Sequence, residues 1–131
     1  MNTVPRIEAL LDALASLNGW VSPDSDAYQL RNPLLLPNFS LPGKNEVDEK
    51  GRRVFKTAIS GVHSCLFDLT LKVKGESRAG LKKEDKLENL LGVYNVKELG
   101  GQQAVVKFLR RALKDQTITV KTPLAYFRQE S

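Results

Sequence analysis

Apolar residues recur every three or four positions near the start of the chain, a spacing that places side chains on one face of a helix. The positions are Ile7, Leu10, Leu11, Leu14 and Leu17. Thr3 can cap the start of such a helix, Pro5 suits its first turn, and Gly19 suits the left-handed residue that ends it. The pattern therefore predicts a helix over about residues 4–18.

A longer stripe with the same spacing follows in the middle of the chain. Its members are Val54, Ala58, Val62, Leu66, Leu69 and Val73. We expect a helix over residues 46–74 that ends at Gly75. Glycine weakens a helix by up to about 1 kcal/mol relative to alanine, so Gly51 favours a start nearer residue 52. Residues 69–74 also alternate as a strand does, but the unbroken stripe favours a helix there.

The last part of the chain predicts two more helices and a final turn. The first covers about residues 83–94, where the apolar positions are Leu87, Leu90, Leu91 and Tyr94. After Gly100 and Gly101, an amphipathic pattern predicts a helix over about residues 101–115. Its apolar members are Ala104, Val105, Phe108, Leu109, Ala112 and Leu113. Residues 117–120 read as a short strand or an extended link, and Thr122-Pro123 opens a last turn.

Residues 19–44 interrupt every regular pattern, because prolines break helices there and the segment is still rich in large apolar side chains. The prolines are Pro23, Pro33, Pro37 and Pro42. Leaving so much apolar surface in water costs about 25 cal/mol per Å², so we expect an ordered arm. Packing on its own domain is the commoner outcome for such a run, and contact with a second copy is the alternative. The candidate interface residues are Leu34, Leu35, Leu36 and Phe39.

These elements add up to an all-α fold of about five helices around one core, with a long ordered apolar loop. With 131 residues, 41% of them hydrophobic and 27% charged, the chain suits a single globular domain over 1–131. The expected parts are a helix over 1–18, the arm over 19–44 and a basic helical core over 45–131. No apolar run approaches the roughly 18 residues of a membrane span, and no secretory leader is visible. A single cysteine fits a cytoplasmic location.

The residues that most often carry catalysis do not converge in the sequence. His63 and Cys65 are two positions apart, and such residues do not face each other on a helix. A structural zinc site needs four ligands of the cysteine or histidine type, and the chain has two such side chains. No glycine-rich loop is followed by the Lys-Ser/Thr pair of a phosphate-binding motif. We therefore expect no catalytic site, no metal, no cofactor and no small-molecule substrate.

Positive charge is concentrated in one part of the chain. Residues 1–50 carry a net charge of −3 and residues 51–131 carry +8, which gives the overall +5. Such asymmetry indicates either an anionic partner or a self-complementary assembly.

A stripe of cations at helical spacing lies on the 101–115 segment, opposite its apolar face. Its members are Lys107, Arg110, Arg111 and Lys114. Other residues that are candidates for nucleic-acid contact are Lys82, Lys83, Lys86, Gln102 and Gln103. Such a stripe can follow a row of phosphates, although a plain solvated face is the commoner meaning of this pattern. The two successive helices also suggest a helix-turn-helix, with a connection that is long for that motif.

The sequence thus favours a non-enzymatic, cytoplasmic interaction module that associates with itself through the 30–41 arm or the long helix. The alternative is a small DNA- or RNA-associated protein that uses the cation stripe.

Overall fold

The computed structural model of the chain describes residues 5–37, 46–76, 80–82 and 84–128. These residues form five α-helices and one 3-10 helix, with isolated β-bridges and no sheet. The helices are α1 (Arg6–Leu17), α2 (Asp26–Leu30), α3 (Ala58–Lys74), α4 (Leu87–Val93), α5 (Leu99–Leu113) and the 3-10 helix η2 (Leu124–Arg128). The predicted all-α fold is confirmed.

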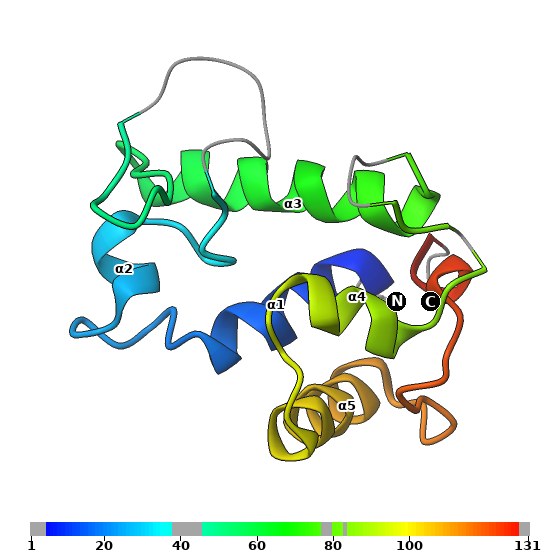
Figure 1. The fold of residues 1–131 in the computed structure, drawn as a ribbon. Helices are drawn as coiled ribbons and strands as arrows, with labels where there is room; N and C mark the ends of the chain where they lie inside the picture. Colours follow the sequence, from blue (N-terminus) through cyan, green and yellow to red (C-terminus); the bar gives the residue numbers. More distant parts are fainter. Residues whose placement is uncertain (1–4, 38–45, 77–79, 83, 129–131) are drawn as a thin grey trace.

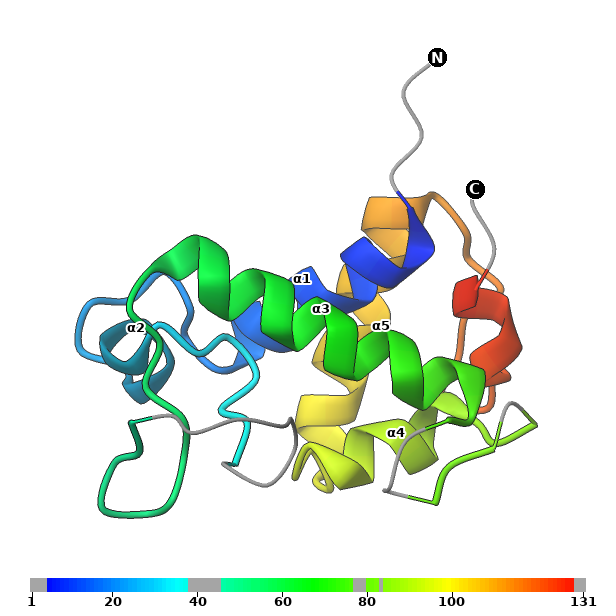
Figure 2. The ribbon, with the colours of Figure 1, turned by 90° about the horizontal axis from the view of Figure 1, so that it is seen from above.

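Helix α1 is the central element of the packing. It contacts α3 on one side, α5 on the other, and η2 near its own start. Figure 1 shows α3 along one edge of the molecule and α5 along the opposite edge, with α1 and α4 between them. Seen from above, α3 crosses over α1 (Figure 2). Three layers of helix therefore enclose the core, and among the described elements α5 packs chiefly on α1.

The end of α1 follows the predicted glycine signal. Gly19 has a φ of 77°, and its N–H donates to the carbonyl of Ser16 at 3.1 Å. The N–H of Trp20 donates to the carbonyl of Ala15 at 3.0 Å, which completes the hydrogen-bond pattern of a glycine-ended helix. The predicted helix over 4–18 is confirmed over Arg6–Leu17.

The predicted start of the long helix is wrong, because α3 begins only at Ala58. Ahead of it lies a tight turn that Asp48 organises: its carboxylate accepts from the backbone N–H groups of Lys50 at 3.0 Å and Arg52 at 2.8 Å. Gly51 has a φ of 79°, which no helix contains. An aspartate that bonds to nearby backbone N–H groups offers the chain an alternative to helix, and here that alternative prevails.

The rest of α3 matches the prediction. Thr57 caps the helix, since its hydroxyl oxygen accepts from the N–H of Ser60 at 3.0 Å. Residues 69–74 are helical, not extended, and Gly75 ends the helix with a φ of 75°.

The proline-rich arm is ordered as far as the structure describes it, and Asn32 is the reason. The Asn32 amide nitrogen donates to the carbonyls of Leu36 at 3.1 Å and Arg53 at 3.0 Å. The Asn32 side-chain oxygen accepts from the N–H of Leu36 at 2.9 Å. This buried amide joins the arm to the segment ahead of α3. The arm also contains α2, a short helix that the sequence analysis did not predict; Ser25 caps it by accepting from the N–H of Tyr28 at 3.1 Å.

The C-terminal elements are shifted from their predicted bounds. Helix α4 begins at Leu87 instead of about residue 83, and α5 begins at Leu99, so Gly100 and Gly101 lie inside α5 and not before it. At Gly101 the packing is close, since a Cβ there would lie 3.2 Å from the Val96 side chain. Residues 117–120 are not a strand, and the predicted last turn is η2. No helix among the described residues is long and apolar enough to cross a lipid bilayer.

Candidate nucleic-acid interface on helix α5

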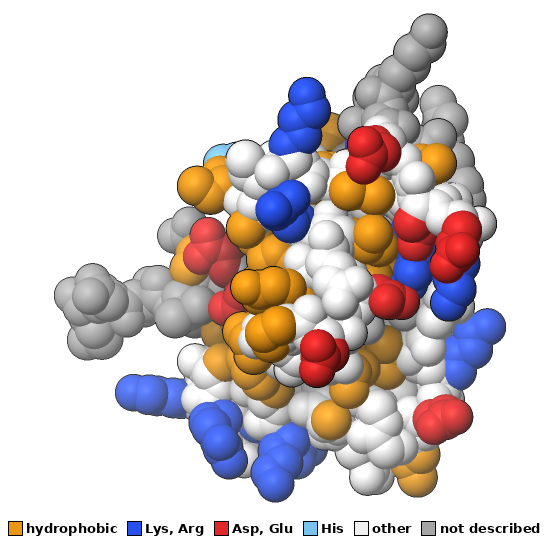
Figure 3. Space-filling view, turned by 90° about the vertical axis from the view of Figure 1, so that its left-hand side faces the viewer, with side chains coloured by type: hydrophobic (Ala, Val, Ile, Leu, Met, Phe, Trp, Pro, Cys, Tyr) orange, Lys and Arg blue, Asp and Glu red, His pale blue; other side chains and the backbone are white. Residues whose placement is uncertain are grey.

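Helix α5 buries one face and presents the other to solvent. Val105, Val106 and Leu109 are buried toward the core, while Lys107 and Arg111 are exposed on the opposite side. Lys114, the left-handed residue that ends the helix, is exposed as well. Lys107 and Arg111 are one helical turn apart on the same face, and Lys114 follows one turn further on, at the residue that ends the helix. Figure 3 shows Lys and Arg side chains grouped along the lower edge of the molecule, the edge that α5 forms in Figure 1.

The fourth predicted member of the stripe has a different role. Arg110 is half-buried, and its Nε donates to the carbonyl of Ile118 at 2.8 Å. It therefore joins α5 to the segment that follows the helix. We refer to Lys107, Arg111 and Lys114 together as the cation row.

The cation row shares its helix with no carboxylate and is followed directly by one ionised carboxylate, that of Asp115. Helix α5 contains no Asp or Glu. Among the described ion pairs, none joins a member of the row to a carboxylate. The nearest carboxylate in sequence, Asp115, accepts from the Thr117 hydroxyl at 2.6 Å and the Tyr126 hydroxyl at 2.7 Å. These hydrogen bonds, first from Thr117 and then from Tyr126, lower the pKa of Asp115 to about 2.

The structure separates the two predicted glutamines. Gln102 is half-buried and its amide nitrogen donates to the carbonyl of Val96 at 3.1 Å, so it holds the start of α5 against the preceding connection. Gln103 is exposed on the outer face, one helical turn before Lys107. Only Gln103 is therefore placed to reach a ligand beside the cation row.

The remaining predicted cations do not lie on α5. Lys82 and Lys86 are exposed in the segment that leads into α4. Lys83 lies outside the described residues. The sequence grouped these three residues with the cation row because all are basic, and the fold places Lys82 and Lys86 on another element.

Two of the four predicted interface residues, Leu34 and Leu36, are inside the protein. The exposed fraction of the side chains is 4% for Leu34 and 1% for Leu36, and both belong to the hydrophobic core. Leu35 is half-buried with a φ of 55°, and Phe39 lies outside the described residues. The arm packs on its own domain at Leu34 and Leu36, which is the commoner outcome expected for it, and those two side chains are not available to a second copy.

The interior holds a polar cluster that the sequence analysis missed. Asp68 and Lys72, one turn apart on the buried side of α3, form an ion pair. The Tyr94 hydroxyl donates to the same Asp68 oxygen at 2.6 Å, and Lys72 Nζ lies 4.6 Å from the centre of the Tyr94 ring. Burial raises the pKa of the Tyr94 hydroxyl well above its usual value. The acid–base spacing of four within an apolar stripe was the available signal. The cluster links α3 to the end of α4.

Neither residue of the His63–Cys65 pair is placed for catalysis. Cys65 is fully buried in the core, and burial raises the pKa of its thiol to about 12. His63 is exposed on the outer side of α3. Within the part of the chain that the structure describes, no three His, Cys, Asp or Glu side chains are grouped as metal ligands would be.

An open apolar pocket lies where the end of α1, α2 and the start of α3 meet. Its volume is about 560 Å³. It is lined by Trp20, Val21, Tyr28, Gln29, Arg31 and Ala58, and we call it the Trp20 pocket. Figure 3 looks onto this end of the molecule and shows apolar side chains gathered near its centre. The pocket could not be predicted from the sequence, because the fold brings its lining residues together from three segments of the chain.

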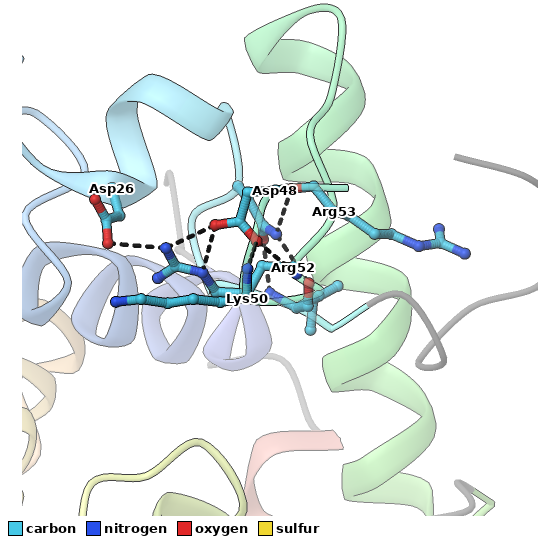
Figure 4. Close-up of polar contacts among 7 residues, drawn as sticks. Asp26, Asp48, Lys50, Arg52 and Arg53 are labelled. Carbon is cyan, nitrogen blue, oxygen red and sulfur yellow. Dashed lines mark hydrogen bonds and ion pairs between the residues drawn. The ribbon is translucent and has the colours of Figure 1, made fainter. Parts of the chain in front are cut away.

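A surface ion cluster fixes one side of this region. The guanidinium of Arg52 pairs with Asp26 at 2.9 Å and with Asp48 at 2.7 Å. Figure 4 shows Arg52 between the two carboxylates, joining the first turn of α2 to the Asp48 turn. The cluster holds α2 in place and gives these two acids, which are 22 residues apart in the sequence, a common structural role.

No protein-family model, curated protein or solved structure matches this chain.

Proposed function

We propose that this protein binds nucleic acid through the outer face of α5, with the cation row in contact with phosphates. The observation that carries the proposal is the row itself: three exposed cations along one helix face, without a carboxylate on the helix. A protein gains affinity for nucleic acid by replacing the counterions condensed on phosphates with its own fixed cations.

The dimensions of the row support this proposal. Lys107 and Lys114 are seven residues apart, which corresponds to about 10 Å along a helix axis. The long flexible stems of lysine and arginine extend the reach of the row to either side. The net charge of +8 on residues 51–131 adds a longer-range attraction for a polyanion.

A binding role without catalysis forms part of the proposal, as does a cytoplasmic location. The one thiol, Cys65, is free and buried, which suits a reducing compartment. The carboxylate of Asp68 is buried in the core, where it forms an ion pair with Lys72 and accepts a hydrogen bond from Tyr94. These contacts give it a structural role.

The experiment that tests the proposal measures the salt dependence of binding. The affinity for a fluorescent mixed-sequence oligonucleotide is followed by anisotropy over a salt series, for the wild type and for Lys107→Gln/Arg111→Gln/Lys114→Gln. Each lost phosphate contact lowers the slope of log affinity against log salt by about 0.9, so the triple variant should lose about 2–3 units of slope.

The matched control is Lys50→Gln/Lys56→Gln/Lys74→Gln, which removes the same charge from exposed positions off α5. It should bind with nearly the wild-type slope. Equal losses in the two triple variants would show that only net charge matters, and would refute a defined site on α5.

The Trp20 pocket favours a second candidate function, self-association of an interaction module. The exposed fraction is 82% for Val21 and 49% for Tyr28, and reaches 70% for Ile59 beside the pocket residue Ala58. Contiguous exposed apolar surface of this kind is typical of protein contacts. This candidate keeps the predicted role but moves it from residues 30–41 to the Trp20 pocket, which the first part of the arm and the start of α3 line.

Light scattering over a concentration series tests this second candidate. The wild type should rise in mean mass with concentration, and Val21→Glu/Tyr28→Ser should stay a monomer. Phe67→Ser, which removes an exposed aromatic ring from α3 outside the pocket lining, is the control and should behave as the wild type. A wild type that stays monomeric throughout contradicts self-association through this pocket.

A further inference from the structure

The outer face of α5 has two halves with different chemistry. The C-terminal half carries the cation row. The N-terminal half presents Gly100, Gln103 and Ala104, all of them exposed. A Cβ built on Gly100 meets no atom within 4 Å, so the space in front of it is open. Along these three positions the helix is slim and accessible, with one amide side chain, and the exposed residues Glu98 and Leu99 lie at its start.

A slim helix face suits one feature of nucleic acid in particular. The major groove of B-form DNA is about 12 Å wide and admits an α-helix, and glutamine amides pair with base edges there. A helix of 15 residues is about 22 Å long, which is enough to place one half in the groove and the other beside the phosphates. The small side chains of Gly100 and Ala104 permit close approach, and the cation row follows the backbone.

The aromatic residues argue against a single-stranded ligand on this face. Proteins that bind single strands stack bases on exposed aromatic rings. The aromatic residue of α5, Phe108, is half-buried and packs against the core. Among the described residues, the exposed large aromatic side chains are Tyr28 on α2 and Phe67 on α3. The outer face of α5 therefore has cations that can contact phosphates, and it has no exposed aromatic ring on which bases could stack.

The order of α4, a short connection and α5 along the chain resembles a helix-turn-helix, although α5 packs chiefly on α1. Residues 94–98 connect α4 to α5, and Asn95 in this connection has a φ of 65°. The inner side of α5 packs on α1, and Val96 of the connection lies next to Gly101 near the start of α5. The connection is about one residue longer than usual for the motif. In that motif the second helix enters the major groove, and Figure 1 shows α5 at the lower edge of the molecule, as such a role needs.

Resting on the proposed function, we infer that α5 inserts into the major groove of double-stranded DNA, with Gly100, Gln103 and Ala104 facing base edges and the cation row on the flanking phosphates. The positive charge of the cation row favours a nucleic acid as the ligand, and the small side chains of the N-terminal half favour a B-form duplex. Double-stranded RNA has a deep, narrow major groove that side chains cannot read. A comparison of DNA and RNA duplexes therefore distinguishes insertion into the groove from contact with the phosphates alone.

The test compares four probes of equal length: a DNA duplex, the same duplex as RNA, a DNA single strand, and heparin as a polyanion without bases. The wild type should bind the DNA duplex at least about tenfold more tightly than the RNA duplex or the single strand, which corresponds to about 1.4 kcal/mol. Ala104→Trp, which places a bulky ring on the outer face without a change in charge, should abolish that preference and leave heparin binding unchanged.

Gln103→Ala is the second variant, because it removes the amide without adding volume and should reduce discrimination among duplex sequences. Circular dichroism confirms that each variant folds. Equal affinity for the three nucleic acids, or an unchanged preference in Ala104→Trp, would overturn groove insertion while the cation row still accounts for binding. If the wild type binds none of the four probes, the proposed function itself fails. That outcome differs from equal affinity and from an unchanged preference, because both of those require measurable binding.

Discussion

Gly61 allows α3 to lie against the backbone of the proline-rich arm. A Cβ at this position would lie 1.8 Å from the carbonyl oxygen of Arg31 and 2.9 Å from its carbonyl carbon. Contacts that short do not occur between folded elements, so any side chain would force α3 and the arm apart. The sequence pattern marks Gly61 only as a residue that weakens a helix, whereas packing requires it.

Replacing Gly61 with alanine should therefore destabilise the protein. Overpacking of this kind typically costs about 1–3 kcal/mol, and the contact with a fixed backbone carbonyl places Gly61→Ala near the upper end. Gly92→Ala in α4 is the control, since nothing lies within 4 Å of its Cβ, and it should gain about 0.5–1 kcal/mol. Urea denaturation measures both; equal stability of the two variants would contradict the packing role of Gly61.

At the scale of the element, α3 buries charge where its pattern predicted only apolar side chains. Its buried residues include Asp68 and Lys72 beside Cys65, Leu69 and Val73. The ion pair and the hydroxyl of Tyr94 satisfy the carboxylate, so α3 and α4 are held together by polar contacts inside an apolar layer. A buried pair contributes little net stability, but each partner is costly to leave alone.

Asp68→Leu should destabilise the protein by about 3–5 kcal/mol, because the Lys72 ammonium is left buried without its carboxylate. The double variant Asp68→Leu/Lys72→Met should recover most of that loss. The control is the exposed pair of Lys121 and Glu88, where Lys121→Ala should cost no more than about 1 kcal/mol. Urea denaturation of the four proteins provides the comparison, and a double variant as unstable as the single one would show that the pair itself is required.

At the scale of the molecule, the described residues share a single hydrophobic core. It takes side chains from α1, the arm, α3, α4, α5 and η2, including Leu10, Leu36, Leu69 and Phe127. Cys65 lies within it, fully buried, with its side chain 3.6 Å from the oxygen of Asn32. Exposure of this thiol therefore requires the arm and α3 to separate.

Modification of Cys65 by a thiol reagent should accordingly track global unfolding. The native protein should react slowly at neutral pH and at full rate in urea beyond the unfolding midpoint. Ile59→Cys in a Cys65→Ala background is the control, since position 59 is exposed, and it should react at once in the native state. Rapid reaction of native wild type would contradict the closed core.

The raised pKa of this thiol also sets the direction of its pH dependence. The folded value is about 12 against an ordinary value of 9.0, so the unfolded chain loses its proton first as pH rises. The contribution of Cys65 to stability is therefore complete below pH 9 and is lost between pH 9 and about 12. Cys65→Ala should show a smaller decrease in stability over that interval in urea titrations.

The candidate site could be predicted only in part. Helical spacing was enough to place Lys107, Arg111 and Lys114 in one exposed row. The same spacing wrongly added Arg110, whose partner is the carbonyl of Ile118. It also gave Gln102 and Gln103 the same role, although Gln102 donates to the carbonyl of Val96. Both carbonyls are positioned by turns outside the helix, and no periodicity within α5 contains that information.

The sequence by itself determined the helical class, α1 with its glycine end, most of α3, and the two-sided character of α5. Each of these depends on neighbours within about four residues, which a linear pattern records. The tertiary structure decided the rest: the Asp48 turn in place of a helix start, the clamp made by Asn32, the charged pair inside the core, the Trp20 pocket and the burial of Leu34 and Leu36. Most of those features join residues that are distant in sequence, and these residues meet only when the core has formed. In the Asp48 turn, side-chain hydrogen bonds to the backbone compete with helix formation, and a linear pattern does not record that competition.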